Sequence, residues 1–97
     1  MATPYLSVII PNWNGERLLP ACLDSLRRQS YKRFEVLLVD NASRDGSLAL
    51  VCREYPEVKV VALGENRGLT GAANVGIRKA QGEVMVLLNN DTEVHPR

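Results

Sequence analysis

The sequence predicts an α/β fold in which a parallel sheet alternates with helices, and three observations support this prediction. Four short apolar stretches have the length and composition of buried strands. The segments between them repeat apolar side chains at helical spacing. Each apolar stretch also ends in polar residues or glycine. This order indicates a Rossmann-like β-α-β-α-β-α-β arrangement with right-handed crossovers, and its strands are predicted at residues 6–10, 34–39, 58–63 and 84–88.

The first helix is predicted at residues 17–29, and the second at residues 45–55. Cys22 and Cys52 fall on the apolar stripes of these two helices and lack the spacing of metal ligands, so both are expected to be buried, reduced thiols. Ser43 is expected to cap the second helix, while Asp45 would interact favourably with the dipole at its N-terminus.

The third helix is predicted at residues 70–81, ending at Gly82. A face of small residues plus one isoleucine is expected to lie close on the sheet; it consists of Ala72, Ala73, Gly76, Ile77 and Ala80. The fourth strand, residues 84–88, is predicted to be buried on both faces because its apolar run is uninterrupted.

Ligands of open parallel sheets bind beyond the carboxyl ends of the strands. All four strands deliver polar groups to that edge, and the fourth ends in Asn89-Asn90-Asp91. Such oxygen-rich side chains suit a hard divalent cation, which usually brings phosphates with it. A simple turn after the strand is the alternative interpretation.

Composition excludes several classes of protein. With 97 residues, a formal net charge of +1 and no basic stripe, the chain has no electrostatic signature of a nucleic-acid partner. No apolar run approaches the roughly 20 residues of a membrane span, and no signal peptide is visible. A cytoplasmic location is expected because Cys22 and Cys52 are expected to be reduced thiols. The last polar cluster lies close to Arg97, so residues 1–97 are expected to be the N-terminal part of a larger, truncated domain that is capable of self-association.

Several motifs, in order, resemble family-2 glycosyltransferases over essentially the whole chain. The matching segments are residues 7–14, 37–47, 65–68, 71–77, 80–83 and 88–91, and the asparagine-rich last one is most similar to a rhamnosyltransferase-like branch. The resemblance implies the N-terminal, nucleotide-sugar-binding half of a GT-A domain. It further implies inverting sugar transfer, a UDP- or dTDP-linked donor, a saccharide or lipid-linked acceptor, Mg²⁺ or Mn²⁺, and possible attachment to the inner membrane face.

By this resemblance, Pro11, Asn12 and Trp13 border the nucleobase, and Asp40 accepts a hydrogen bond from it. Two alternatives remain open: Trp13 as a hydrophobic lid over the end of the sheet, and Asp40 as a cap of the turn that leads to Ser43. In either of these roles the residue would stabilise the fold without contacting a ligand.

Asn66 and Arg67 precede a glycine-rich helix start, where backbone N–H groups and a guanidinium favour phosphate, so both are candidate donor-binding residues. The alternative is that the glycines only permit a tight turn and close packing.

Asp91 is the candidate metal ligand implied by the family's DxD motif, whereas Asn89 replaces the first acid and could hydrogen-bond a ribose. Asn89 and Asn90 are both candidate nucleotide-sugar-binding residues. Glu93 offers a compensating charge, and His95 is expected to be a solvent-exposed bystander. No catalytic base is assigned in this chain. It is expected beyond Arg97, so residues 1–97 alone should be inactive.

Two other enzyme or signalling classes fit poorly. A dinucleotide-binding dehydrogenase needs Gly-x-Gly-x-x-Gly after the first strand, where this chain has Pro11 to Gly15. A receiver-like module would place its acids after the first and third strands rather than the second and fourth. A non-catalytic nucleotide-binding or scaffolding α/β domain stays open, because a DxD motif that lacks its first acid is compatible with lost activity.

Overall fold

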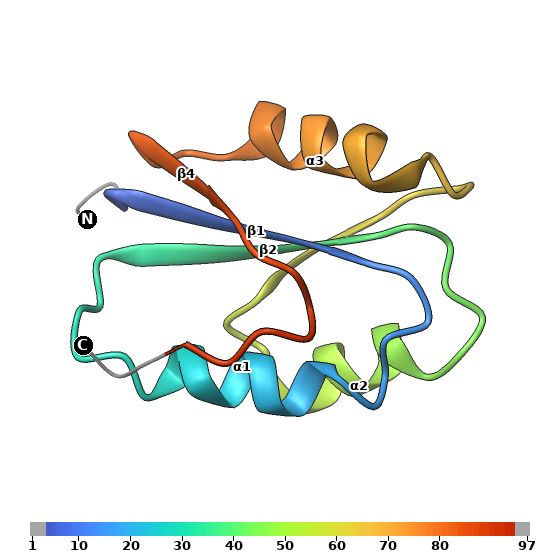
Figure 1. Cartoon of the computed structure of the whole chain (residues 1–97), viewed down its shortest axis with the longest axis horizontal. Helices are drawn as coiled ribbons and strands as arrows, with labels where there is room; N and C mark the ends of the chain where they lie inside the picture. The colour runs from blue at the N-terminus through green and yellow to red at the C-terminus, as the bar shows by residue number, and fades with distance from the viewer. Residues whose placement is uncertain (1–3, 95–97) are drawn as a thin grey trace.

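A parallel sheet of four strands in the order β3-β2-β1-β4 forms the middle of three layers in the computed structural model, which describes residues 4–94 (Figure 1). The alternating α/β fold is therefore confirmed. The elements in chain order are β1 (Leu6–Asn12), α1 (Leu19–Arg27), β2 (Phe34–Asp40), α2 (Ser47–Glu54), β3 (Lys59–Ala62), α3 (Gly68–Lys79) and β4 (Val84–Leu87).

Two helices cover one face of the sheet and one helix covers the other (Figure 1). Helices α1 and α2 pack their apolar stripes against alternate residues of β1 and β2, including Val8, Ile10 and Leu38. On the opposite face, α3 packs on Ile9 and Val39. This division follows from the period-2 alternation of side chains along each strand. None of the helices in residues 4–94 is long and apolar enough to span a bilayer.

The β1–β2 register brings the carboxyl ends of the two central strands level. Asn12 pairs with Asp40 at the end of this ladder. The β1–β4 ladder is shorter and ends at Ile9 and Leu87. The chain after β4 therefore turns away beside the last three residues of β1, and polar side chains from the ends of all four strands come together there.

The prediction that the fourth strand is buried on both faces is wrong. β4 lies at the edge of the sheet, and Val84, Met85, Val86 and Leu87 are each at least 36% exposed. An uninterrupted apolar run has the same local pattern in a central strand and in an uncovered edge strand, so the run alone did not distinguish the two.

Two predicted buried side chains are exposed instead. Cys52 and Ile77 face solvent, whereas Cys22 is buried as expected. α2 lies over the outer part of the sheet and buries only Ser47 and Val51, so its apolar stripe is too narrow to include Cys52.

Two predicted helix-end roles are also wrong. Ser43 does not cap α2, because the helix begins at Ser47 and the Ser47 N–H donates to the Asp45 carboxylate at 3.0 Å. Gly82 lies beyond the end of α3, which stops at Lys79. A Cβ atom on Gly82 would lie 2.6 Å from Ser7 Oγ, so this glycine instead allows the loop to approach β1.

Candidate functional site

An open cleft of about 320 Å³ lies at the carboxyl ends of the strands, where the loops after β1, β2, β3 and β4 converge. It brings together seven of the nine predicted site residues and adds two that were not predicted, Asn41 and Leu69. The cleft is lined by Pro11, Asn12, Trp13, Asn41, Asn66, Leu69, Asn89, Asn90 and Asp91.

Trp13 and Asp91 give the cleft its chemical character. Trp13 is 56% exposed, so its indole offers an aromatic surface at the cleft. Asp91 is exposed in the turn after β4 and contributes the one carboxylate among the lining residues. The remaining polar lining consists of carboxamides, which can both donate and accept hydrogen bonds.

The turn that carries Asp91 rests on α1. The Thr92 N–H donates to the Asn89 carbonyl at 3.1 Å, and the Cys22 thiol approaches the same carbonyl at 4.0 Å. Burial and, secondarily, the charge of Asp91 raise the pKa of the Cys22 thiol to about 11. The thiol beneath the turn therefore stays protonated and can act as a weak donor.

Asp40 is fully buried and does not line the cleft. Its carboxylate accepts hydrogen bonds from Asn12 Nδ2 at 2.9 Å, from Ser43 Oγ at 2.7 Å and from the Ser43 N–H at 2.8 Å. The turn-capping alternative thus describes contacts that exist in the structure. A direct contact with a nucleobase stays a prediction, and it requires this carboxylate to become accessible.

Asn41 connects the end of β2 to the start of α3. Its side chain accepts a hydrogen bond from the Arg67 N–H at 3.0 Å and donates to the Gly68 carbonyl at 3.2 Å. The Asn66 side chain in turn accepts from the Gly68 N–H at 2.8 Å. Asn66 lines the cleft, whereas Arg67 is exposed outside its lining, and its predicted contact with a phosphate remains untested.

Sequence reasoning missed Asn41 although a signal was present. Asn41 directly follows the last residue of β2, and the residue after a parallel strand belongs to the ligand-binding edge. Leu69 carried no such signal, because leucine in the first turn of a helix is ordinary.

The loops after β1 and β2 are joined to each other by side-chain caps. The Asn14 side chain accepts from the Arg44 N–H at 2.8 Å, and the Asn14 N–H donates to Ser43 Oγ at 2.8 Å. The Glu16 N–H donates to the Asp45 carboxylate at 3.0 Å. Burial disfavours the charged form of Asp45, but hydrogen bonds led by Ser47 outweigh it and lower the pKa. These contacts hold one wall of the cleft in place.

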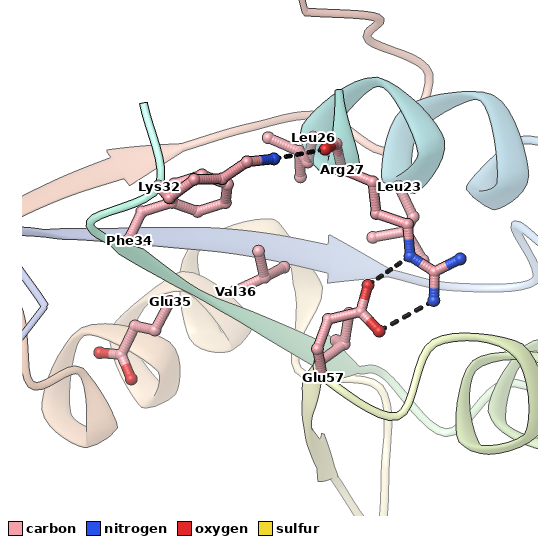
Figure 2. Close-up of a pocket in the computed structure, with 9 residues that line it drawn as sticks. Leu23, Leu26, Arg27, Lys32, Phe34, Glu35, Val36 and Glu57 are labelled. Carbon is pink, nitrogen blue, oxygen red and sulfur yellow. Dashed lines mark hydrogen bonds and ion pairs between the residues drawn. The ribbon is translucent and has the colours of Figure 1, made fainter. Parts of the chain in front are cut away.

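A second cavity, of about 260 Å³, lies between α1, the start of β2 and the loop before β3 (Figure 2). Figure 2 shows two contacts of its charged side chains: Arg27 pairs with Glu57 at 2.6 Å, and Lys32 donates to the Arg27 carbonyl at 2.5 Å. Its floor is formed by Leu23, Leu26 and Val36. This cavity lies at the amino end of β2, away from the converging loops, and the predicted site residues are absent from its lining.

The donor set of the cleft fits a hard divalent cation only in part. A carboxylate and neighbouring amide oxygens are ligands that Mg²⁺ and Mn²⁺ accept. Within residues 4–94, no group of three or more His, Cys, Asp or Glu side chains is arranged to hold a metal. A cation bound at Asp91 would therefore take further ligands from water and from a bound diphosphate. His95 lies outside the described residues.

Comparison with known sequences identifies a family that matches nearly the whole chain. The model of "Glycosyl transferase family 2" matches residues 7–97. Glycosyltransferase AglE of Haloferax volcanii is 32% identical over 97 residues, which cover 95% of this chain and 32% of that protein. The chain thus spans about a third of this relative's length.

Solved structures of proteins with a bound nucleotide sugar also resemble this chain. TarS 1–349 of S. aureus in complex with UDP-GlcNAc superposes with a TM-score of 0.89 at 31% identity, over 95% of this chain and 28% of that one. A mannosyltransferase of Pyrobaculum calidifontis, PcManGT, in complex with GDP-Man and Mn²⁺, superposes with a TM-score of 0.80 at 33% identity. That match covers 94% of this chain and 28% of the other.

Proposed function

Because the chain belongs to glycosyl transferase family 2, we propose that its cleft binds the nucleotide-sugar donor and that the full-length protein transfers the sugar to an acceptor hydroxyl with inversion. The observation that carries this proposal is the position and lining of the cleft. It lies at the carboxyl ends of parallel strands and combines an exposed indole with an exposed carboxylate. The acceptor class we propose is a saccharide or a lipid-linked saccharide.

The proposed donor carries uridine or thymidine diphosphate. The UDP-GlcNAc complex of TarS supports this choice, while the GDP-Man complex of PcManGT makes guanosine the base to test against it. A rhamnosyltransferase-like activity is the finer proposal, and it rests on the Asn89-Asn90-Asp91 segment alone. Donor competition between dTDP-rhamnose and UDP-GlcNAc distinguishes these possibilities.

Each wall of the cleft has a role in the proposal. Trp13 and Pro11 offer an apolar surface to the base, and the predicted contact from Asp40 would complete its recognition. Asn66 and Arg67 lie at the start of α3, and the Arg67 guanidinium is proposed to bind the phosphates there. The Arg67 and Gly68 N–H groups are already bonded to Asn41 and Asn66, so the phosphate would contact the N–H groups of the helix that follow them. Asn89 offers its amide to the ribose.

Asp91 is the residue that would hold Mg²⁺ or Mn²⁺. A bound cation of this kind supplies Lewis-acid stabilisation of the departing diphosphate. The general base for the acceptor hydroxyl is proposed to lie beyond Arg97, so residues 1–97 by themselves should transfer no sugar.

The test is isothermal titration of the full-length protein with UDP, dTDP, GDP and NAD, each with and without Mn²⁺. Binding of a uridine or thymidine diphosphate that strengthens with Mn²⁺ supports the proposal, and Asp91→Asn should remove the strengthening. Absence of binding to every nucleoside diphosphate would instead support the scaffolding alternative. Transfer assays then separate an active enzyme from a nucleotide-binding relative without activity.

We also propose a cytoplasmic location, peripheral to the inner face of the membrane. Two free thiols, Cys22 and Cys52, are consistent with a reducing compartment. Fractionation of cells that produce the tagged full-length protein tests this location, since recovery in an extracellular fraction would contradict it.

A further inference from the structure

A continuous chain of side-chain hydrogen bonds runs through the floor of the cleft, from the turn after β4 to the end of β2. Asn90 Nδ2 donates to Asn12 Oδ1 at 2.8 Å, and Asn12 Nδ2 donates to Asp40 Oδ1 at 2.9 Å. The same Asn12 amide also lies 3.3 Å from Ser43 Oγ. Both ends of the Asn12 carboxamide are therefore engaged within the protein.

The Asn12–Asn90 bond continues the contact between β1 and β4 after the backbone ladder has ended. The last backbone hydrogen bond of this pair joins the Leu88 N–H to the Ile9 carbonyl at 2.9 Å. Beyond Leu88 the chain leaves the sheet, and the amide–amide bond spans 78 positions of sequence to hold it. The next residue along the turn is Asp91.

Gly15 provides independent evidence that this bond is built into the site. A Cβ atom at Gly15 would lie 2.3 Å from Asn12 Oδ1 and 2.3 Å from Asn90 Nδ2, the two atoms of the hydrogen bond. The backbone at Gly15 is buried directly over the pair. Only a residue without a side chain leaves room for both amides there.

We infer that Asn12 and Asn90 are a positioning pair, covered by Gly15, that fixes the turn after β4 so that the Asp91 carboxylate is held at the cleft. Asn12 lines the cleft but is only 1% exposed, and both its Oδ1 and its Nδ2 are hydrogen-bonded within the protein, so its role is to hold Asn90 rather than to bind the donor. The assignment of a cation to Asp91 rests on the proposed function. The anchoring of the turn by Asn12 and Asn90 does not depend on it.

The first test is amide hydrogen exchange of the full-length protein without ligand. Asn90→Ala should accelerate exchange of the Thr92 N–H, which is bonded to the Asn89 carbonyl, by about tenfold, the effect of one lost hydrogen bond. Exchange in the β1–β2 ladder should be unchanged. Unaltered exchange at Thr92 would overturn the inference, whether or not the protein binds a nucleotide.

The second test is the affinity of UDP with and without Mn²⁺. Mn²⁺ should increase the affinity for UDP by a factor that is about fivefold to tenfold smaller in Asn90→Ala than in the wild type. The affinity for UDP without Mn²⁺ should change by less than about twofold. The double variant Asn12→Ala with Asn90→Ala should lose no more of the Mn²⁺-dependent increase in UDP affinity than Asn12→Ala alone, because both substitutions break the same hydrogen bond. Equal losses with and without Mn²⁺ would assign Asn90 to direct ligand contact and overturn the inference.

Gly15→Ala tests the same bond from the other side. It should reproduce the effects of Asn90→Ala, because the added methyl group separates the two amides. Gly64→Ala is the matched control, since a Cβ atom there would meet nothing within 4 Å. If wild-type protein binds no nucleotide with Mn²⁺, the proposed function fails, while the exchange measurements still decide whether the pair anchors the turn.

Discussion

Glu35 is a buried carboxylate that joins three parts of the fold on the α3 side of the sheet. It accepts hydrogen bonds from Ser7 Oγ at 2.5 Å, from Lys59 Nζ at 2.6 Å and from the Gln81 N–H at 2.6 Å. Burial disfavours its charge, but these donors, led by Lys59, outweigh burial and lower its pKa below the ordinary value of 4.5. The carboxylate therefore contributes to stability in its ionised form.

Glu35→Gln should lower the free energy of unfolding at pH 7 by about 1–3 kcal/mol, because the amide cannot accept all three hydrogen bonds. The pKa of Glu35 is lower in the folded protein than its ordinary value of 4.5 in the unfolded chain. The stability that ionised Glu35 provides is therefore complete above pH 4.5 and is lost as the pH falls through the folded-state pKa. Urea unfolding at pH 7 and at pH 3 measures this, and the difference between wild type and variant should shrink at pH 3.

The control for Glu35→Gln is Glu54→Gln. Glu54 pairs with Arg53 on the surface, with its side chain 53% exposed, and a surface substitution usually changes stability by less than about 0.5 kcal/mol. Equal losses in the two variants would show that the buried network contributes nothing specific.

The two cysteines should differ strongly in reactivity. Cys22 is buried with a pKa raised to about 11, whereas Cys52 is exposed. Because the thiolate is the nucleophile, only about one Cys22 thiol in a thousand is ionised at pH 8. Among residues 1–97, a disulfide reagent such as DTNB should modify one thiol rapidly, and Cys52→Ser should abolish that phase. Rapid modification of Cys22 in the folded protein would contradict the prediction.

At the scale of elements, the packing of α3 on the sheet depends on the absence of a side chain at Gly76. A Cβ atom there would lie 2.5 Å from Ile9 Cγ2 and 3.1 Å from Val39 Cγ2. Replacing a helical glycine by alanine ordinarily stabilises a helix by about 1 kcal/mol. Here the clash reverses the sign, because overpacking costs about 1–3 kcal/mol.

Gly76→Ala should therefore lower the thermal unfolding midpoint, as measured by circular dichroism. Asn74→Ala is the matched control, because Asn74 lies on the exposed side of the same helix and its replacement should be neutral or slightly stabilising. A midpoint that rises in Gly76→Ala would mean that α3 can move away from the sheet without loss.

The sequence predicted the elements because strand length and helical spacing are local properties, and observed bounds differ from predicted ones by a few residues. It also predicted the cleft, since strand ends of a parallel sheet share one edge. It left open the direction of the Asp40 side chain between a ligand contact and a cap of the turn to Ser43, and in the structure this side chain turns inward to Asn12 and Ser43. The exposure of β4 could not be predicted from its sequence either, because it depends on the order of the strands, which is a property of the whole sheet.

At the scale of the whole molecule, β4 presents an open edge with apolar side chains on both faces. Met85 and Leu87 are 40% and 53% exposed, and Val86 and Leu88 line an apolar cavity of about 180 Å³ beside Tyr31. Edge strands with unpaired backbone groups and apolar side chains favour pairing with another strand. Self-association through β4 is therefore the expected behaviour of the 97-residue chain when it is purified by itself.

Met85→Lys combined with Leu87→Lys should weaken that association at least about tenfold, because two charges at the interface oppose strand pairing and two apolar contacts are lost. Sedimentation velocity over a range of concentrations measures the change. Ile77→Lys is the control: Ile77 is 46% exposed but lies on α3 rather than on the sheet edge, so its replacement should leave the association unchanged. Association that is insensitive to the β4 charges, or a chain that is monomeric at every concentration, would show that this edge does not pair with a second copy.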